Sequence, residues 1–466
     1  MDARVTDLPE AWLRAQRDRL WAEYLDLVRI PSVSAKPDHA GDVRRAADWV
    51  ARRCARAGLG NVRILAEGGH PSVYAEWLGA PDMPTILVYA HYDVQPPEPL
   101  ELWTTPPFEP TLREGRLYAR GASDDKATLF ISLAAIEAWM ATTGRLPCNI
   151  KVFYEGEEET GSPTLGAILD RHGALLKADL CLSADGGMML PDRPDVSVGN
   201  RGICKLEFTL RTAAKDMHSG SYGGAILNPL VAIARVIASL HEEDGRVAVP
   251  GFYDGVRETT ERDRAELAAV PFDEAAWLAG VGASKAWGER DRSVLEKLWL
   301  RPTLEINGMW GGYQGEGSKT VLPCEAHAKI TCRLVSGQDP KRVQAAVAGH
   351  LRAVCPEGAT IEIRLGGGGA AAYEIPPDHP ALAAIERLLE DVYGKPCFRT
   401  RIGGTLPLCA LFRDRLGLDT VPMSFSTADE DFHAPNEFFR AESFDRGLTA
   451  WVRVFEALAS LPRRRA

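Results

Sequence analysis

Four apolar segments of the chain are each followed at once by histidine or acidic side chains. They are residues 85–93, 149–159, 178–185 and 420–433, written TILVYAHYD, NIKVFYEGEEE, ADLCLSAD and TVPMSFSTADEDFH. Imidazole and carboxylate groups make a good ligand set for zinc, and they also suit manganese or cobalt. If the four segments end at one place in the fold, the pattern predicts metal-dependent chemistry there.

The second segment ends in a concentration of negative charge, with four glutamates within residues 155–159. Such a charge run is most often a solvated loop. Here it follows a segment that reads as buried, and buried carboxylates are costly unless cations compensate them. The run therefore favours a site that holds positive charge opposite this turn.

Each candidate residue also has an ordinary structural reading when it is considered alone. A histidine after a strand is usually structural, and Asp124 with Asp125 could cap the helix that follows. Asp185 suits a turn, and His433 could lie in a surface loop. Together, however, these readings would gather uncompensated carboxylates at one edge of a sheet. Two divalent ions would balance the charge of the carboxylates concerned, which are Asp124, Glu158, Glu159 and Asp185.

The elements that would position these residues form a layered α/β domain. The apolar segments are continuous, which is typical of strands buried on both faces of a parallel sheet. Helical patterns at 125–141 and 162–176 lie between them, as in a helix-covered sheet. Ligands of such sheets bind beyond the carboxyl ends of the strands. We therefore expect a mostly parallel sheet with all four polar clusters at one edge.

The middle of the chain has a different pattern. Residues 204–212, 326–335 and 359–365 alternate between apolar and polar side chains, which predicts an antiparallel sheet with one wet face. Helices are expected at 228–240 and 339–354, each opening with Asn or Asp before a proline. This part of the chain is expected to be a smaller α+β domain.

These patterns divide the chain into two domains. Residues 1–202 and 377–466 are expected to form the metal-binding catalytic domain. Residues 203–376 are expected to form an α+β domain inserted into it. Within the insert, residues 243–301 read as a charged, partly helical excursion without an assigned role.

The overall composition excludes some classes of partner. Of the 466 residues, 54 are basic and 64 acidic, giving a net charge of −10, which disfavours binding to nucleic acid or to an anionic membrane. No apolar run reaches the roughly 18 residues of a membrane span, and the charged N-terminus does not resemble a secretory signal. The nine cysteines form no CxxC pair, as expected of a reducing cytoplasm. We therefore expect a cytoplasmic protein.

The order of the motifs resembles one known family over nearly the whole chain. This is the di-zinc peptidase family of carboxypeptidase G, aminoacylase-1, succinyl-diaminopimelate desuccinylase and the carnosine-type dipeptidases. The HYDVQP form, the long excursion at 243–301 and the GSKTVLP and CRLV pair look closest to the dipeptidase branch. The motifs that carry the resemblance are YAHYDVQP (89–96), ARGASDDK (119–126), EGEEETGS (155–162), SADG (183–186), DMHSGSYGG (216–224), GSKTVLP (317–323), CRLV (332–335), GGTLP (403–407) and DEDFHAPNE (429–437).

The resemblance implies two divalent metal ions per subunit, most readily zinc, with manganese or cobalt as alternatives. By this resemblance Asp124 bridges the two ions. His91 and Asp185 complete the ligands of one ion, and Glu159 and His433 complete those of the other. It also implies a cis peptide bond between Asp124 and Asp125. The family usually has glycine where this chain has Ala127, which is a small change at the start of a helix.

The implied reaction is hydrolysis of an amide bond. Water between two metals loses a proton near neutral pH, and Glu158 is implied to take that proton and deliver it to the leaving amine. Asp93 is expected to orient His91 through the second imidazole nitrogen. His218, on the insert, is implied to stabilise the oxyanion and to reach the site of the partner subunit in a homodimer. The insert would thus act as a lid and dimerisation domain.

A cation is also needed for the free carboxylate of the substrate. Arg333 lies on the polar face of its strand, where its ordinary reading would be a solvated side chain. Its guanidinium could bind a carboxylate through two hydrogen bonds. The resemblance implies that Thr320, Gly404 and Thr405 hold the same end of the substrate, and it places His379 nearby.

Three functions remain open at this level. The leading hypothesis is a metal-dependent dipeptidase or small-peptide hydrolase. The second is an N-acyl-amino-acid amidohydrolase with the same metals and a different pocket. The third is a non-catalytic metal-binding protein, and the presence of Glu158, which the family does not use as a ligand, argues against it.

Overall fold

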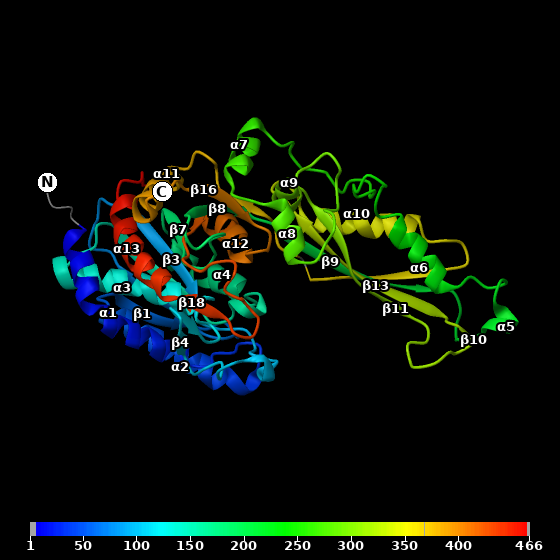
Figure 1. The fold of residues 1–466 in the computed structure, drawn as a ribbon, viewed down its shortest axis with the longest axis horizontal. Helices are drawn as coiled ribbons and strands as arrows, with labels where there is room; N and C mark the ends of the chain where they lie inside the picture. Colours follow the sequence, from blue (N-terminus) through cyan, green and yellow to red (C-terminus); the bar gives the residue numbers. More distant parts are fainter. Residues whose placement is uncertain (1–5, 368, 464–466) are drawn as a thin grey trace. The chain divides into compact units, whose positions relative to one another are not determined.

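A six-stranded sheet in the order β1-β2-β6-β3-β7-β17 lies at the centre of the first of two units (Figure 1). The computed structural model describes residues 6–367 and 369–463. β6, β3, β7 and β17 pair in parallel, whereas β1 and β2 pair antiparallel at one side of the sheet. The strands are β1 (Gly60–Leu65), β2 (Ser72–Trp77), β3 (Thr85–His91), β6 (Asn149–Glu155), β7 (Leu180–Ser183) and β17 (Thr420–Pro422). The expected mostly parallel sheet is therefore confirmed.

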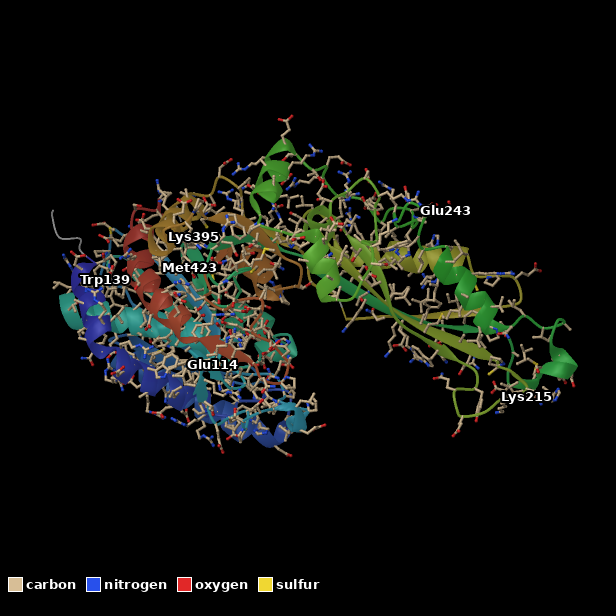
Figure 2. The ribbon with its side chains drawn as sticks, viewed as in Figure 1. Glu114, Trp139, Lys215, Glu243, Lys395 and Met423 are labelled. Carbon is tan, nitrogen blue, oxygen red and sulfur yellow. The ribbon has the colours of Figure 1, made fainter. Side chains whose placement is uncertain are left out.

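Helices cover this sheet, because its strands are apolar on both faces. α3 is buried along most of its length, since it is apolar on all sides and packs between β3 and the outer helices α1 and α13. Trp139 lies in this layer (Figure 2) and donates its indole N–H to the backbone oxygen of Val452 at 2.9 Å. The helices are α1 (Asp7–Val28), α2 (Ala40–Arg56), α3 (Lys126–Thr143), α4 (Leu165–Leu176), α11 (Pro380–Tyr393), α12 (Pro407–Leu416) and α13 (Ala441–Leu458).

Two small three-stranded sheets and three 3-10 turns accompany these elements. One sheet has the order β18-β5-β4 and the other β15-β8-β16. Their strands are β4 (Thr111–Arg113), β5 (Arg116–Tyr118), β8 (Asp195–Asn200), β15 (Tyr373–Glu374), β16 (Phe398–Ile402) and β18 (Phe438–Arg440). The 3-10 turns are Pro37–His39, Leu100–Leu102 and Glu158–Thr160.

The second unit contains a four-stranded antiparallel sheet in the order β11-β13-β9-β14. Alternate residues of β9, including Leu206, Phe208 and Leu210, face a core that α6 and α10 cover. Asn228 and Asp339 cap these helices, each accepting hydrogen bonds from backbone amides of the first turn. The strands are β9 (Gly202–Arg211), β11 (Thr303–Gly311), β13 (Glu325–Leu334) and β14 (Thr360–Leu365). The alternating pattern of the sequence thus produces the expected antiparallel sheet.

Shorter elements complete this unit. β10 pairs with β12 apart from the main sheet, and three short helices lie in the 243–301 excursion. These elements are β10 (Met217–His218), β12 (Val321–Leu322), α5 (Ser219–Tyr222), α6 (Pro229–Ala238), α7 (Glu261–Ala269), α8 (Glu274–Gly280), α9 (Val294–Trp299) and α10 (Pro340–Ala353).

The division of the chain differs slightly from the expected boundaries. The first unit comprises the chain through Val198, Ile375–Thr400 and the chain from Leu411 onward. The second comprises Gly199–Glu374 together with Arg401–Ala410. Arg401–Ala410 therefore belongs with the inserted part, although the sequence pattern assigned it to the catalytic domain. The hydrogen bonds of Gly403 and Thr405 to Arg201 and Arg333 of the second unit account for this difference.

Two further properties follow from the described residues. None of their helices combines the length and the apolar character needed to cross a membrane. All nine cysteines are free thiols. Six of them are buried as small apolar side chains, namely Cys54, Cys148, Cys181, Cys204, Cys332 and Cys409.

Candidate metal centre and substrate site

The carboxyl ends of three neighbouring strands place the candidate ligands of the first unit. His91 is the last residue of β3 and is only 1% exposed. Glu158 and Glu159 lie in the 3-10 turn that follows β6, and Asp185 lies two residues after β7. Because β6 and β7 both pair in parallel with β3, their polar ends meet at one edge of the sheet.

Asp124 connects the two histidines of this edge. Its Oδ1 atom is 3.0 Å from His91 Nε2, and its Oδ2 atom is 3.0 Å from His433 Nε2. His433 Nε2 is also 3.2 Å from Glu159 Oε2. The two oxygens of one carboxylate thus face two separate groups of donors, which is the arrangement expected of a bridging ligand.

The residues fit divalent metal ions. His91, Asp124 and Glu159 each offer one ligand atom, and these atoms all lie within 4.8 Å of one another. His433 lies in direct contact with two of these residues, Asp124 and Glu159. Imidazole nitrogen with carboxylate oxygen suits zinc, manganese or cobalt. The donor set and its spacing therefore support binding of divalent cations.

The acidity of the site supports the same conclusion. Burial raises the pKa of Glu158 well above its usual range, and the carboxylates of Asp185, Glu159 and Asp124 raise it further. Burial and the charge of Asp124 raise the pKa of Glu159 to about 7. Burial, followed by the charge of Asp124, raises the pKa of Asp185 to about 6. Nearby positive charge would stabilise the deprotonated forms of these groups and lower their pKa values again.

Hydrogen bonds between the histidines and Asp124 shift the pKa values of the two kinds of group in opposite directions. Hydrogen bonds with Asp124 and Glu159 raise the pKa of His433 to about 10. Burial alone would raise the pKa of Asp124, but its hydrogen bonds with His433 and His91 hold that pKa below its usual range. His433 also has a φ angle of 61°, a left-handed conformation that is uncommon for a residue with a side chain and concentrates at functional sites.

Asp93 links His91 to the acidic turn. Its Oδ1 and Oδ2 atoms accept hydrogen bonds from the backbone amides of Glu158 and Glu159, at 3.2 and 3.1 Å. The Nδ1 atom of His91 lies 3.1 Å from the backbone oxygen of Asp93 and 3.5 Å from its Oδ1 atom. Asp93 therefore positions the imidazole and the Glu158–Glu159 backbone relative to each other.

Glu437 holds the segment that carries Asp124. Its carboxylate accepts the backbone amides of Gly121, Ser123 and Asp124 at 3.0, 3.0 and 3.1 Å. It also accepts a hydrogen bond from Arg120 Nη1 at 2.8 Å, and both charged side chains are 1% exposed. The bond between Asp124 and Asp125 is cis, as the resemblance implied. The sequence reading gave Glu437 no role, although the DEDFHAPNE motif contains it.

Gln95 is a second residue that the sequence reading left without a role. Its Nε2 atom donates hydrogen bonds to Glu159 Oε2 at 2.8 Å and to the backbone oxygen of Glu159 at 3.1 Å. The sequence feature that could have identified Gln95 is its position in the HYDVQP motif, four residues after His91. Gln95 thus fixes the direction of the Glu159 carboxylate.

The other two glutamates of the acidic turn have structural contacts. Tyr89 donates its hydroxyl to Glu155 at 2.8 Å. Glu157 accepts the backbone amides of His70 at 3.0 Å and of Thr164 at 2.7 Å. These contacts give Glu155 and Glu157 structural partners that Glu158 and Glu159 do not share.

The second unit brings together three of the residues expected at the substrate carboxylate. Arg333, near the end of β13, donates from Nη1 to Thr405 Oγ1 at 2.8 Å. The backbone oxygen of Gly404, next to Thr405, accepts the amide of Arg201 at 3.1 Å. Arg333, Gly404 and Thr405 therefore lie in one polar cluster.

His218 and Thr320 form a separate pair in the same unit. His218 pairs with Val321 across β10 and β12, and the amide of Ser219 donates to the oxygen of Thr320 at 3.0 Å. β10, which contains His218, lies beyond the Glu325 end of β13 (Figure 1), and Thr320 precedes β12, which leads into that end, whereas Arg333 is near the other end. The eight steps along the strand from Glu325 to Arg333 span about 26 Å. Thr320 and Arg333 of one chain are therefore too far apart to hold the same small carboxylate.

His379 is placed in the first unit as the cap of α11. Its Nδ1 atom accepts the amide of Ala381 at 3.2 Å, and its Nε2 atom is 3.9 Å from Asp419 Oδ2. These contacts account for a structural role. The part in substrate binding that the resemblance implied for His379 stays a prediction.

Comparison with known proteins places the chain among characterised relatives. Residues 87–457 match the family model of peptidase family M20/M25/M40. Cysteinylglycine-S-conjugate dipeptidase of Corynebacterium striatum is 30% identical over 404 residues, which cover 85% of this chain and 86% of that protein. Cys-Gly metallodipeptidase dug1 of Schizosaccharomyces pombe is 27% identical over 449 residues, covering 93% and 94%.

A solved structure shares both the fold and part of the sequence. The M20 family metallo-carboxypeptidase Sso-CP2 from Sulfolobus solfataricus has a TM-score of 0.83 and 31% identity, and the match covers 95% of this chain and 99% of that one. The family match spans most of the chain and includes every strand end that carries a candidate metal ligand. The chain therefore belongs to peptidase family M20/M25/M40 and is a metal-dependent hydrolase.

Proposed function

We propose that the protein hydrolyses the peptide bond of dipeptides or small peptides that carry a free C-terminal carboxylate. The observation that carries this proposal is the position of Asp124 between His91 and His433, with the half-buried acid Glu158, whose pKa is raised, beside it. Two relatives, a Cys-Gly metallodipeptidase and a cysteinylglycine-S-conjugate dipeptidase, support a dipeptide substrate by their names.

Five side chains of the first unit would hold two divalent ions, for which zinc is the first candidate. Asp124 would bridge them, with His91 and Asp185 on one side and Glu159 and His433 on the other. When bound, such ions supply Lewis acidity, which lowers the pKa of water and polarises a carbonyl oxygen. Asp93, Gln95 and Glu437 would keep these ligands oriented, because outer hydrogen bonds of this kind tune metal sites; their contacts are given above.

Glu158 would carry the proton. Its carboxylate lies in the same buried, acidic surroundings as the ligands, and these surroundings raise its pKa. A carboxylate with a raised pKa accepts a proton from attacking water more readily and can then pass it to the leaving amine. This role agrees with the position of Glu158 directly before the ligand Glu159.

Arg333 would bind the C-terminal carboxylate of the substrate. Its guanidinium makes its hydrogen bond to the neutral oxygen of Thr405, which leaves its charge available for an anion. Gly404 and Thr405 lie beside it and would offer further polar contacts. Arginine suits this task because its planar fork can bind both oxygens of a carboxylate.

His218 and Thr320 would act across a homodimer. Within one chain they lie beyond the Glu325 end of β13, and that end is about 26 Å along the strand from Arg333, so they would reach the carboxylate site from another copy. His218 of the partner subunit would then donate to the oxyanion, while Thr320 of the partner subunit would contact the substrate carboxylate. A symmetric dimer of this kind contains two equivalent shared sites.

The test is a substrate panel with controlled metal content. The protein is stripped with a chelator, reloaded separately with zinc, manganese and cobalt, and assayed on dipeptides, on the same dipeptides with amidated C-termini, and on N-acetyl and N-succinyl amino acids. We expect metal-dependent cleavage of the free dipeptides and at least tenfold slower cleavage of the amidated ones. Faster turnover of the N-acyl amino acids would instead assign the protein as a deacylase.

A further inference from the structure

A large cavity of the second unit contains Arg333 and reaches the excursion whose role the sequence left unassigned. Its volume is about 780 Å³, which lies within the range of small-molecule sites. The 243–301 excursion supplies Trp277, Trp287 and Lys297 to its lining. In Figure 2, Glu243 marks the start of this excursion. The excursion therefore builds part of the wall around the proposed carboxylate-binding arginine.

Arg201 is a second guanidinium in this cavity. Its Nε atom donates to the backbone oxygen of Gly403 at 3.0 Å, so its partner, like that of Arg333, is a neutral oxygen. Within residues 6–367 and 369–463, no carboxylate oxygen lies within 4.0 Å of either guanidinium. The Nη1 atom of Arg201 is buried and has no hydrogen-bond partner in this part of the chain. A buried donor in this state has an unmet demand for an acceptor.

The two guanidiniums influence each other. Burial and the charge of Arg333 together lower the pKa of Arg201 to about 10, and the charge of Glu305 offsets part of the effect. Arg201 and Arg333 also contact the two sides of one loop, through Gly403 and Thr405 respectively. Two like charges thus face one cavity with a short loop between them.

Lys297 adds a third cation to the lining. A Cβ atom placed on Gly403 would lie 3.8 Å from Arg201 Nη2 and 4.0 Å from the backbone oxygen of Leu298, so Arg201 and the residue after Lys297 both adjoin Gly403. Lys297 forms no ion pair with any described residue. The last turn of α9 therefore brings the unpaired ammonium group of Lys297 to the same cavity.

The remaining charges of the lining do not cancel these cations. Arg301 is neutralised locally, because its Nε atom lies 2.9 Å from Glu289 Oε2. The other acid of the lining is Glu305, on the exposed part of β11. Three unpaired cations therefore share a cavity with one unpaired carboxylate, whereas a single substrate carboxylate would satisfy only one of them.

We propose that this cavity receives the C-terminal residue of the substrate and selects one with an acidic side chain, so that the preferred substrates are dipeptides ending in Asp or Glu. Arg333 binds the α-carboxylate, and Arg201 with Lys297 binds the side-chain carboxylate. Arg201 and Lys297 are thus specificity-determining residues. This inference rests on the proposed dipeptidase function and on the role of Arg333 within it.

The test compares Ala-Glu with Ala-Gln, which has nearly the same shape and lacks the negative charge. For the metal-loaded full-length protein we expect kcat/KM to be at least tenfold higher for Ala-Glu, mainly through a lower KM. In Arg201→Gln and in Lys297→Met the ratio of the two kcat/KM values should fall toward one. Arg201→Lys, which keeps the charge, should retain more of the ratio than Arg201→Gln, and Lys297→Glu should shift preference toward Ala-Lys.

Arg352→Gln is the matched control, because Arg352 is an exposed arginine of α10 in the same unit and lies outside the cavity lining. It should leave the Ala-Glu to Ala-Gln ratio within twofold of the wild type. Equal kcat/KM for Ala-Glu and Ala-Gln in the wild type would overturn the inference, as would an unchanged ratio in both Arg201→Gln and Lys297→Met. Failure to cleave any free dipeptide, or equal cleavage of amidated ones, would instead overturn the proposed function.

Discussion

The Oδ2 atom of Asp93 accepts a hydrogen bond from the backbone amide of Glu159 at 3.1 Å. The other oxygen of Asp93 accepts the amide of Glu158 at 3.2 Å and lies 3.5 Å from His91 Nδ1. One carboxylate thus ties the end of β3 to the turn after β6. The relative position of the proposed ligands His91 and Glu159 and of the proposed base Glu158 therefore depends on Asp93, which has none of these roles.

Asp93→Ala should weaken metal binding without unfolding the protein. Two backbone amides would lose their acceptor, and His91 would lose part of its orientation. Loss of such an outer contact typically lowers metal affinity by about 10- to 100-fold, which competition with a chromogenic chelator measures. Glu109→Ala, at an exposed position outside the site, is the control. Unchanged affinity in Asp93→Ala would contradict the positioning role.

Glu158→Gln should separate metal binding from catalysis. The amide has the same shape as the carboxylate and cannot accept the proton, so kcat on a cleaved dipeptide should fall by about 100- to 10,000-fold. The metal content, measured by mass spectrometry, should stay at the wild-type value because Glu158 is not one of the proposed ligands. Near-native turnover with the metals bound would show that another group carries the proton.

Glu437→Gln should destabilise the fold more than an ordinary loss of charge. The carboxylate of Glu437 is buried and accepts three backbone amides in addition to its bond with Arg120. Breaking a buried pair of this kind typically costs about 3–5 kcal/mol, seen as a lower free energy of unfolding in urea. The control is Glu442→Gln, because the exposed pair of Glu442 with Arg446 is expected to contribute less than about 1 kcal/mol. Equal stability of the two variants would argue against the anchoring role of Glu437.

Asp195 should make stability depend on pH between about 4 and 6. Burial raises the pKa of this carboxyl from 3.8 to about 6, and its hydrogen bonds with Met189 and Thr400 offset only part of that rise. As pH rises, the carboxyl of Asp195 therefore loses its proton at a lower pH in the unfolded chain than in the folded protein. The contribution of Asp195 to stability is therefore complete below pH 3.8 and lost as pH passes 6, a change of about 3 kcal/mol at most.

The measurement for Asp195 is the free energy of unfolding against pH for the wild type and for Asp195→Asn. We expect the variant to lose less stability than the wild type between pH 4 and 6, whatever constant offset the substitution brings. Asp18→Asn, at a fully exposed carboxyl, should follow the wild-type slope. Parallel curves for the wild type and Asp195→Asn would show that Asp195 does not titrate in this range.

Mixed dimers should test whether His218 acts across subunits. His218→Ala and Glu158→Gln should each be nearly inactive alone. In a mixed dimer, the site that keeps Glu158 receives His218 of the partner subunit, so one of the two shared sites is intact. Coexpression in equal amounts should therefore restore about a quarter of wild-type activity, given two equivalent sites per symmetric dimer. Activity no greater than that of the separate variants would contradict the shared site.

Much of the fold followed from local sequence patterns. The continuous apolar runs became β3, β6, β7 and β17, because strands buried on both faces need apolar side chains at every position. The strictly alternating run 204–212 became β9, which has one buried and one wetter face. These patterns act over short distances along the chain, so sequence alone could predict both the mostly parallel sheet and the antiparallel insert.

The candidate metal ligands were also identifiable from sequence, because a parallel sheet collects the residues that follow its strands. Tertiary structure decided which groups hold them. Glu437 reaches the backbone of Asp124 from a position 313 residues away, and no local pattern specifies such a contact. The same holds for Arg201, which reads as a single charged residue before β9 and gains meaning only beside Gly403, Arg333 and Lys297. Residue types at strand ends determined the chemistry that is available, whereas long-range packing decided its geometry and the shape of the cavity proposed to select the substrate.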